Sequence, residues 1–139
     1  MKTVLVDANV LVSFLTDRNE DQQERAAALL SAAREREHTL VLHTISVSEA
    51  SYVLRNLYKV DQQEIADSMR QLLGLPGVVS TGEVSWSLVF ERWPDVIPNF
   101  GDAILAATAV QESCDAVATF DRPLRKKLAQ QGSVSYWSD

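Results

Sequence analysis

Short apolar runs along the chain alternate with longer segments in which apolar residues recur every three or four positions. Residues 3–6, 39–42 and 116–120 are short, apolar runs of the kind found in buried strands. Residues 78–79 and 133–136 are weaker candidates for a minor strand and a final strand. Because helical segments separate these strands, the pattern predicts an α/β fold in which a mainly parallel sheet is covered by helices.

The segments between the strands have one apolar face each, as amphipathic helices do. Asp61, with Glu64 three residues later, is typical of a helix N-terminus. An aromatic stripe recurs at helical spacing, and we interpret it as core or dimer interface rather than a cofactor site; its members are Trp86, Val89, Phe90 and Trp93. The predicted helices cover residues 9–15, 20–36, 46–58, 61–73, 102–113 and 123–130.

Length and composition narrow the class of protein. A chain of 139 residues with 46% hydrophobic residues is the size of one ordinary domain and can bury a core. It contains no apolar run near the roughly 18 residues that a membrane span needs, so we expect no membrane association and a cytoplasmic location. The single cysteine, Cys114, excludes an intramolecular disulfide and is expected to be a small core residue within a helix.

The net charge of −6 argues against a passive nucleic-acid binder, because such proteins are usually basic. It leaves a metal-dependent nuclease open, since bound divalent cations offset the charge of acidic ligands. Four acids have positions that suit such a site. Asp7 and Asp121 each follow a predicted strand, and the carboxyl ends of parallel strands share the edge of the sheet where ligands bind. Glu49 and Asp102 lie near the starts of helices that would begin at that same edge.

Four carboxylates at one place repel each other, which raises their pKa values and costs stability unless a cation binds. Carboxylate oxygens suit Mg²⁺ or Mn²⁺, whereas a zinc site is hard to assemble from only His38, His43 and one cysteine. A divalent cation activates water and stabilises the oxygens of a phosphodiester during cleavage. No phosphate-binding glycine loop or Ser-His-Asp arrangement competes with this interpretation.

Each acid also has an ordinary structural interpretation. Asp7, Asp102 and Asp121 all precede predicted helices, where Asp is a favoured N-cap. Glu49 alone is more typical of a helix surface. The joint placement of the four acids favours a shared site, but the spatial argument by itself leaves a metal site and a set of structural acids equally open.

Four motifs resemble those of the PIN-domain family, and among its members the VapC-like ribonuclease toxins of bacterial toxin–antitoxin pairs. The resemblance extends over essentially the whole chain, and the order and spacing of the motifs fit. The motifs are TVLVDANVL around Asp7, ISVSE ending at Glu49, FGDAILAA around Asp102, and ATFD ending at Asp121.

This resemblance implies a single PIN domain over residues 1–139, folded as a three-layer α/β/α sandwich with a central, mainly parallel sheet. It implies a metal-dependent endoribonuclease with one or two Mg²⁺ or Mn²⁺ ions. The partners that it implies are RNA, a second copy in a homodimer, and a cognate antitoxin through which the protein meets promoter DNA. The implied catalytic and metal-binding residues are Asp7, Glu49, Asp102 and Asp121, with Asn9 and Thr119 as auxiliary residues.

Basic side chains near these acids are candidate phosphate contacts. Arg122 follows Asp121 directly, and Arg55 and Lys59 lie on the helix that carries Glu49; a solvated helix face is the alternative for each. Residues 87–99, with two prolines, look individual to this chain and are a candidate for setting substrate or partner choice.

Three other functions stay open. One is an RNA-processing PIN nuclease that is not a toxin. Another is a phosphatase of the haloacid dehalogenase type, although Asn9 stands where that family has Asp. The third is a non-catalytic interaction module on the same fold, against which the full set of acids argues.

Overall fold

A parallel four-stranded sheet forms the centre of the computed structural model, which describes residues 1–138. Its strands are β1 (Lys2–Val6), β2 (His38–His43), β3 (Val78–Thr81) and β4 (Ala116–Ala118). The helices are α1 (Ala8–Leu15), α2 (Glu20–Arg34), α3 (Thr44–Asn56), α4 (Gln62–Leu73), α5 (Trp86–Phe90), α6 (Phe100–Gln111) and α7 (Arg122–Gln130).

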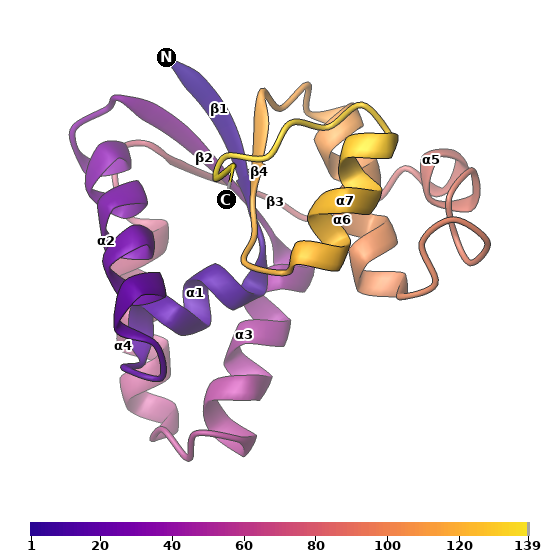
Figure 1. Ribbon diagram of the computed structural model, residues 1–139. Helices are drawn as coiled ribbons and strands as arrows, with labels where there is room; N and C mark the ends of the chain where they lie inside the picture. The colour runs from indigo at the N-terminus through magenta and orange to yellow at the C-terminus, as the bar shows by residue number, and fades with distance from the viewer. Residues whose placement is uncertain (139) are drawn as a thin grey trace.

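Helices cover both faces of the sheet (Figure 1). Because successive strand residues point to opposite faces, Val4 and Val6 of β1 face α1 to α4, whereas Leu5 faces α5 to α7. Leu40 and Leu42 of β2 join the first core and Val41 joins the second. The prediction of a three-layer α/β/α sandwich around a parallel sheet is therefore confirmed.

The strand order β3-β2-β1-β4 places a topological switch between β1 and β4. The chain proceeds from β1 outward through β2 to β3, and then crosses to the other side of β1 to form β4. In open α/β sheets, the crevice beyond the carboxyl ends of the strands at such a point is the usual ligand site. Asp7 follows β1 directly, and Asp121 lies three residues beyond the end of β4.

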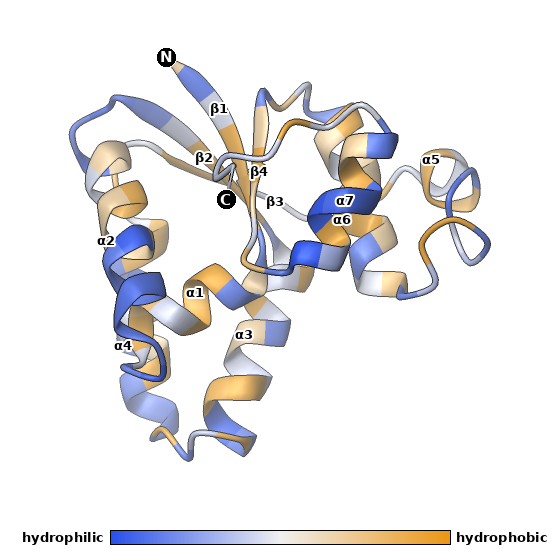
Figure 2. Ribbon diagram, in the orientation of Figure 1, coloured by the Kyte–Doolittle hydropathy of each residue, from blue (hydrophilic) through white to orange (hydrophobic). Residues whose placement is uncertain are grey.

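The distribution of apolar and hydrophilic residues agrees with this layered arrangement of sheet and helices. Figure 2 shows β1 as mostly apolar below its first residues, and α7 as largely hydrophilic. The α7 helix carries Arg122, Arg125, Lys126 and Lys127, yet it buries Leu124 and Leu128 against the sheet. Within residues 1–138, no helix combines the length and apolar character needed to cross a membrane.

Several predicted boundaries were wrong. Residues 133–136 form only an isolated bridge, Val117 to Ser135, rather than a final strand. The β4 strand ends at Ala118 because the backbone of the next residues turns to bond side chains: the Phe120 N–H donates to Asn9 Oδ1. The α2 helix ends at Arg34, since Arg36 adopts a left-handed conformation with φ of 60°. Cys114 lies beyond α6 and is only partly buried.

The α3 helix begins at Thr44, two residues earlier than predicted, because His43 caps it. The Ile45 N–H donates to His43 Nδ1 at 3.0 Å, and the other ring nitrogen lies 2.8 Å from the Glu83 carbonyl oxygen. Histidine is an uncommon cap, and the sequence offered no reason to expect it.

The aromatic stripe is divided rather than buried as a unit. Val89 is fully buried, whereas Trp86 and Phe90 are 54% and 60% exposed. Their rings belong to an exposed cluster with Trp93 and Phe100, in which neighbouring centroids lie 5.0 to 6.1 Å apart. Of the two interpretations of the stripe, core holds for Val89 but not for Trp86 and Phe90, for which a dimer interface stays a prediction.

Candidate active site

All four predicted acids line one cavity of about 250 Å³, here called the acid pocket. It lies beyond the carboxyl ends of β1 and β4, where the first turns of α1, α3 and α7 come together in Figure 1. Asp7, Glu49, Asp102 and Asp121 come from four separate parts of the chain. The rest of its wall is formed by Ala8, Asn9, Val12, Arg18, Val53 and Asn99.

Asp7 is the most buried of the four acids, with 8% of its surface exposed. It is the N-cap of α1: its Oδ1 accepts a hydrogen bond from the Ala8 N–H at 2.7 Å. Its Oδ2 accepts from the Thr119 hydroxyl, also at 2.7 Å. Asp7 can therefore cap α1 and still bind a ligand in the acid pocket, because each oxygen keeps a lone pair for a further partner.

Thr119 and Asn9 link the two ends of the chain behind Asp7. Asn9 Nδ2 donates to Thr119 Oγ1 at 3.1 Å, and the Asp121 N–H donates to the same hydroxyl at 3.1 Å. Asn9 Oδ1 accepts from the Phe120 N–H at 3.2 Å. Thr119 is fully buried, so this network fixes β4 and its following turn against the start of α1.

Asp102 lies in the first turn of α6 but is not its cap. The cap is Asn99, whose Oδ1 accepts from the Asp102 N–H at 2.9 Å. The alternative interpretation of Asp102 as the cap of this helix was wrong, and its carboxylate lines the acid pocket instead. Asp121 does cap α7: its Oδ1 accepts from the Leu124 N–H at 3.0 Å.

Glu49 stands between two hollows. It lines the acid pocket and also a neighbouring groove of about 440 Å³. Asp7 and Asn99 line both spaces as well, so the two are continuous at this point. The remaining residues of the groove are Ile45, Ser46, Ser48, Tyr52, Phe100 and Gly101.

The electrostatics show that the acids act on each other. Desolvation raises the pKa of Asp7, and the charge of Asp121 adds to that rise. Desolvation and the charge of Asp7 raise the pKa of Glu49. For Asp102, desolvation and then the charges of the three other acids raise the pKa from 3.8 to about 6, although Lys127 opposes the rise. A cluster with these shifts is typical of a functional site.

The donor set fits a hard divalent cation, because all four side chains offer carboxylate oxygens. Mutual repulsion in the acid pocket is what such a cation relieves. Within residues 1–138, no three His, Cys, Asp or Glu side chains already stand close enough to hold an ion together. Asp7, Glu49, Asp102 and Asp121 are the residues that would hold such a cation.

The predicted phosphate contacts lie in different places. Arg122 does not line the acid pocket but an adjacent hollow, together with Arg125 and Lys126. Arg55 is exposed in the last turn of α3, away from the pocket wall. Lys59 lies beyond the end of α3, not on it, in a left-handed conformation with φ of 57°. The structure brings none of these three into the acid pocket.

Sequence reasoning missed two polar residues of the pocket wall, Arg18 and Asn99. Asn99 could have been found, because it stands three residues before Asp102 at a favoured N-cap position. Arg18 lies in the connection between two helices, and its arrival at the pocket depends on how those helices pack.

Fold and site together define an α/β protein with an acidic pocket at the switch point of a parallel sheet. The sequence model of the PIN domain matches residues 4–127. The chain therefore belongs to the PIN-domain family, which confirms the resemblance seen in its motifs. No curated protein sequence gives a significant match.

Solved structures share this fold at low sequence identity. VapC20 of Mycobacterium tuberculosis, described as a sarcin-ricin loop cleaving toxin, has a TM-score of 0.69 at 13% identity, covering 97% of this chain and 99% of that chain. VapBC2 of Rickettsia felis, solved with a DNA fragment from its promoter, has a TM-score of 0.67 at 12% sequence identity, and the match covers 98% of this chain and 99% of that chain. PAE2754 of Pyrobaculum aerophilum has a TM-score of 0.65 at 21% sequence identity, and the match covers 96% of this chain and 83% of that chain.

Proposed function

We propose that this PIN-domain protein is a metal-dependent endoribonuclease whose active site is the acid pocket. The observation that carries the proposal is the convergence of Asp7, Glu49, Asp102 and Asp121 from four elements on one cavity at the switch point. Desolvation, followed by repulsion among the acids, raises the pKa values of three of them, an energetic cost that a purely structural arrangement would avoid.

One or two Mg²⁺ or Mn²⁺ ions would be held by these four carboxylates and would supply an activated water and charge neutralisation at the scissile phosphate. Thr119 holds Asp7 in place through its 2.7 Å hydrogen bond, and Asn9 holds Thr119. The cut would leave 5′-phosphate and 3′-hydroxyl ends. Arg122, beside Asp121, would contact the RNA outside the pocket; Arg55 and Lys59 are weaker candidates for the same role.

The biological role that we propose is that of the toxin of a toxin–antitoxin pair, acting as one domain over the whole chain and as a homodimer. The structural likeness to VapC20 and to the VapBC2 complex with promoter DNA supports it. By analogy, an antitoxin would be the partner and would make the DNA contacts. An RNA-processing nuclease would share the chemistry, and a short reading frame next to the gene would favour the toxin.

The test is cleavage by the purified protein. We expect discrete cleavage of a pool of tRNA and structured RNA in Mn²⁺ or Mg²⁺, and none in EDTA, because the carboxylates alone cannot generate the nucleophile. Gel electrophoresis with end-group analysis reads out the products, and calorimetry on the same sample measures Mn²⁺ binding. A protein that neither cleaves RNA nor binds Mn²⁺ would instead be an interaction module on this fold.

Thr119→Val tests the support of Asp7. Valine has nearly the same shape but cannot donate to Asp7 or accept from Asn9 and the Asp121 N–H. We expect cleavage to fall roughly 10- to 100-fold, as for groups that orient metal ligands. Unfolding should require about 1–3 kcal/mol less, because buried partners are left unpaired.

Thr108→Val is the matched control for that variant. Thr108 is also buried, and its hydroxyl donates only to the Ile104 carbonyl of its own helix. Denaturant titration and cleavage assays should show a small loss of stability with unchanged activity. Equal activity losses in the two variants would contradict the proposed role of Thr119.

A further inference from the structure

Arg18 is the one arginine or lysine in the wall of the acid pocket, as far as residues 1–138 describe it. It lies between α1 and α2, three residues beyond the end of the helix that Asp7 caps. A cation in the wall of a four-carboxylate pocket has two explanations. It either neutralises the acids or is held for another anion.

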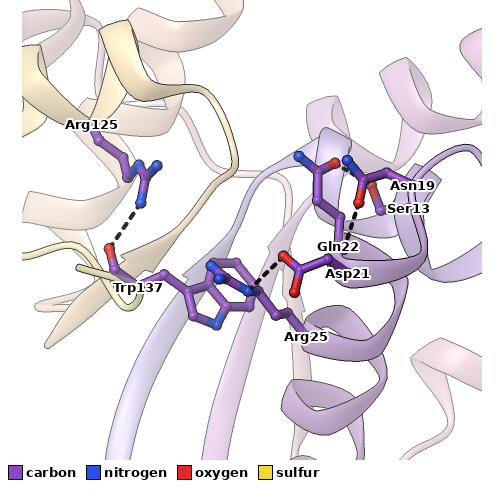
Figure 3. Close-up of polar contacts among 7 residues, drawn as sticks. All are labelled: Ser13, Asn19, Asp21, Gln22, Arg25, Arg125 and Trp137. Atoms are coloured by element: carbon purple, nitrogen blue, oxygen red, sulfur yellow. Dashed lines mark hydrogen bonds and ion pairs between the residues drawn. The ribbon is translucent and has the colours of Figure 1, made fainter. Parts of the chain in front are cut away.

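The guanidinium of Arg18 is fixed by neutral groups. Nη2 donates to Ser13 Oγ at 2.8 Å and to the Asn9 carbonyl at 3.3 Å, and Nε donates to Ser13 Oγ at 3.2 Å. The Ser13 hydroxyl is fully buried and itself donates to Gln22 Oε1 at 3.2 Å. Figure 3 shows Ser13 beside Gln22. The backbone N–H of Gln22 donates to Asn19 Oδ1 at the start of α2. The arginine is therefore pre-oriented by two helices.

No carboxylate compensates its charge. Among residues 1–138, Arg18 forms no ion pair with a carboxylate, and its Nη1 makes no hydrogen bond. It is also not among the groups that shift the pKa values of Asp7, Glu49 or Asp102. Arg25 and Arg70 behave differently: each pairs with an aspartate, Asp21 at 3.1 Å (Figure 3) and Asp67 at 3.0 Å.

We propose that Arg18 is a substrate-binding residue that contacts a phosphate of the RNA next to the scissile bond. The inference rests on the proposed function of the acid pocket. The Nη1 group of Arg18 has no partner within residues 1–138 and can donate to phosphate oxygens, and little rotamer entropy remains to be lost on binding because the side chain is already held. The carboxylates bind the metal cations and Arg18 binds the anionic RNA backbone, so one pocket accommodates both the metal and the substrate.

The competing explanation is that Arg18 merely ties α1 to α2. The experiment therefore compares Arg18→Gln and Arg18→Lys in the full chain, with Arg70→Gln as the matched loss of a positive charge far from the pocket. Cleavage kinetics are measured on a labelled RNA that the wild type cuts, and melting temperature and Mn²⁺ affinity are measured for every variant. Binding of bulk tRNA is measured against salt in an Asp102→Asn background.

We expect Arg18→Gln to raise KM about 10- to 100-fold, the range for a lost hydrogen bond to a charged group, with a smaller change in kcat. The slope of the logarithm of tRNA affinity against the logarithm of salt concentration should fall in magnitude by about one, the value for one lost phosphate contact. Arg18→Lys should recover part of the affinity, because it keeps the charge but loses the planar fork. Mn²⁺ affinity should not change.

Three results would overturn the inference. If Arg18→Gln cleaves and binds RNA like Arg70→Gln, then Arg18 does not contact the substrate while the nuclease proposal stands. If Arg18→Gln and Arg18→Lys lose activity only in proportion to a lost melting temperature, then the role is structural. If the wild type neither cleaves RNA nor binds tRNA, then the proposed function fails and this inference fails with it.

Discussion

Asp102→Asn is expected to lower the rate of metal-dependent RNA cleavage by roughly 10³-fold, the loss expected when a metal ligand that contributes several kcal/mol is removed. Asp102 lines the acid pocket, and desolvation followed by the charges of the three other acids raises its pKa to about 6. An amide has the size of the carboxylate but carries no charge for a cation. The initial rate on a labelled RNA, at saturating Mn²⁺, measures the loss.

This variant should fold normally, which makes it a sharp test. The α6 helix is capped by Asn99 through the backbone N–H of Asp102, and that hydrogen bond survives the substitution. Asp95→Asn is a matched control, because Asp95 is exposed between α5 and α6 and lies outside the acid pocket. Equal cleavage by Asp102→Asn and the wild type would mean a contaminating nuclease or a wrongly placed active site.

The stability of the metal-free protein is expected to rise as the pH falls from about 7 toward 4. A carboxyl whose pKa is raised on folding binds its proton more readily in the folded state than in the unfolded state. Between the unfolded value of 3.8 and the folded value of about 6 for Asp102, the folded protein holds more protons, so the free energy of unfolding decreases as the pH rises through this window. The raised pKa values of Asp7 and Glu49 act in the same direction.

Mn²⁺ should reverse this trend. At about 100 times its Kd, a ligand that binds only the folded state adds about 2.7 kcal/mol to the free energy of unfolding. For a domain of this size, that corresponds to a rise in melting temperature of roughly 5–10 °C. The rise should be present at pH 7 and lost below pH 6, where protons compete for the carboxylates.

Melting curves in EDTA and in Mn²⁺ across pH 4–8 check both statements. In Asp102→Asn, the EDTA curve should depend less on pH, because a carboxyl whose pKa is raised from 3.8 to about 6 on folding is gone. Melting temperatures that rise with pH in EDTA, or that ignore Mn²⁺ at pH 7, would contradict the coupling of these acids to one another and to a cation.

The layered architecture and the placement of the four acids at one edge of the sheet could be predicted from the sequence alone. The predicted strands at residues 3–6 and 39–42 formed, because a strand covered by helices on both faces of a parallel sheet needs only apolar side chains at successive positions. The motifs around Asp7 and Asp121 could be placed on one edge, since each follows a strand and parallel strands end together. These are local patterns with a fixed geometric consequence.

The tertiary structure decided what depends on contacts between distant segments. Residues 133–136 are apolar enough for a strand, yet they reach only one bridge to Val117, because strand formation needs a partner edge of sufficient length. Trp86 and Phe90 have helical spacing but lie on the outer side of a five-residue helix that buries only Val89. Periodicity identifies a face and does not say whether another element covers it.

The acid pocket shows the same division. Thr119 reaches Asp7 across 112 positions of sequence, and Arg18 reaches the pocket wall because Ser13 and Gln22 on two packed helices hold it there. The family motif ending at Asp121 pointed to Thr119 as an auxiliary residue, whereas no local pattern sets Arg18 apart. The hydrogen bonds of both residues depend on distances between segments that only the packing of the helices and strands sets.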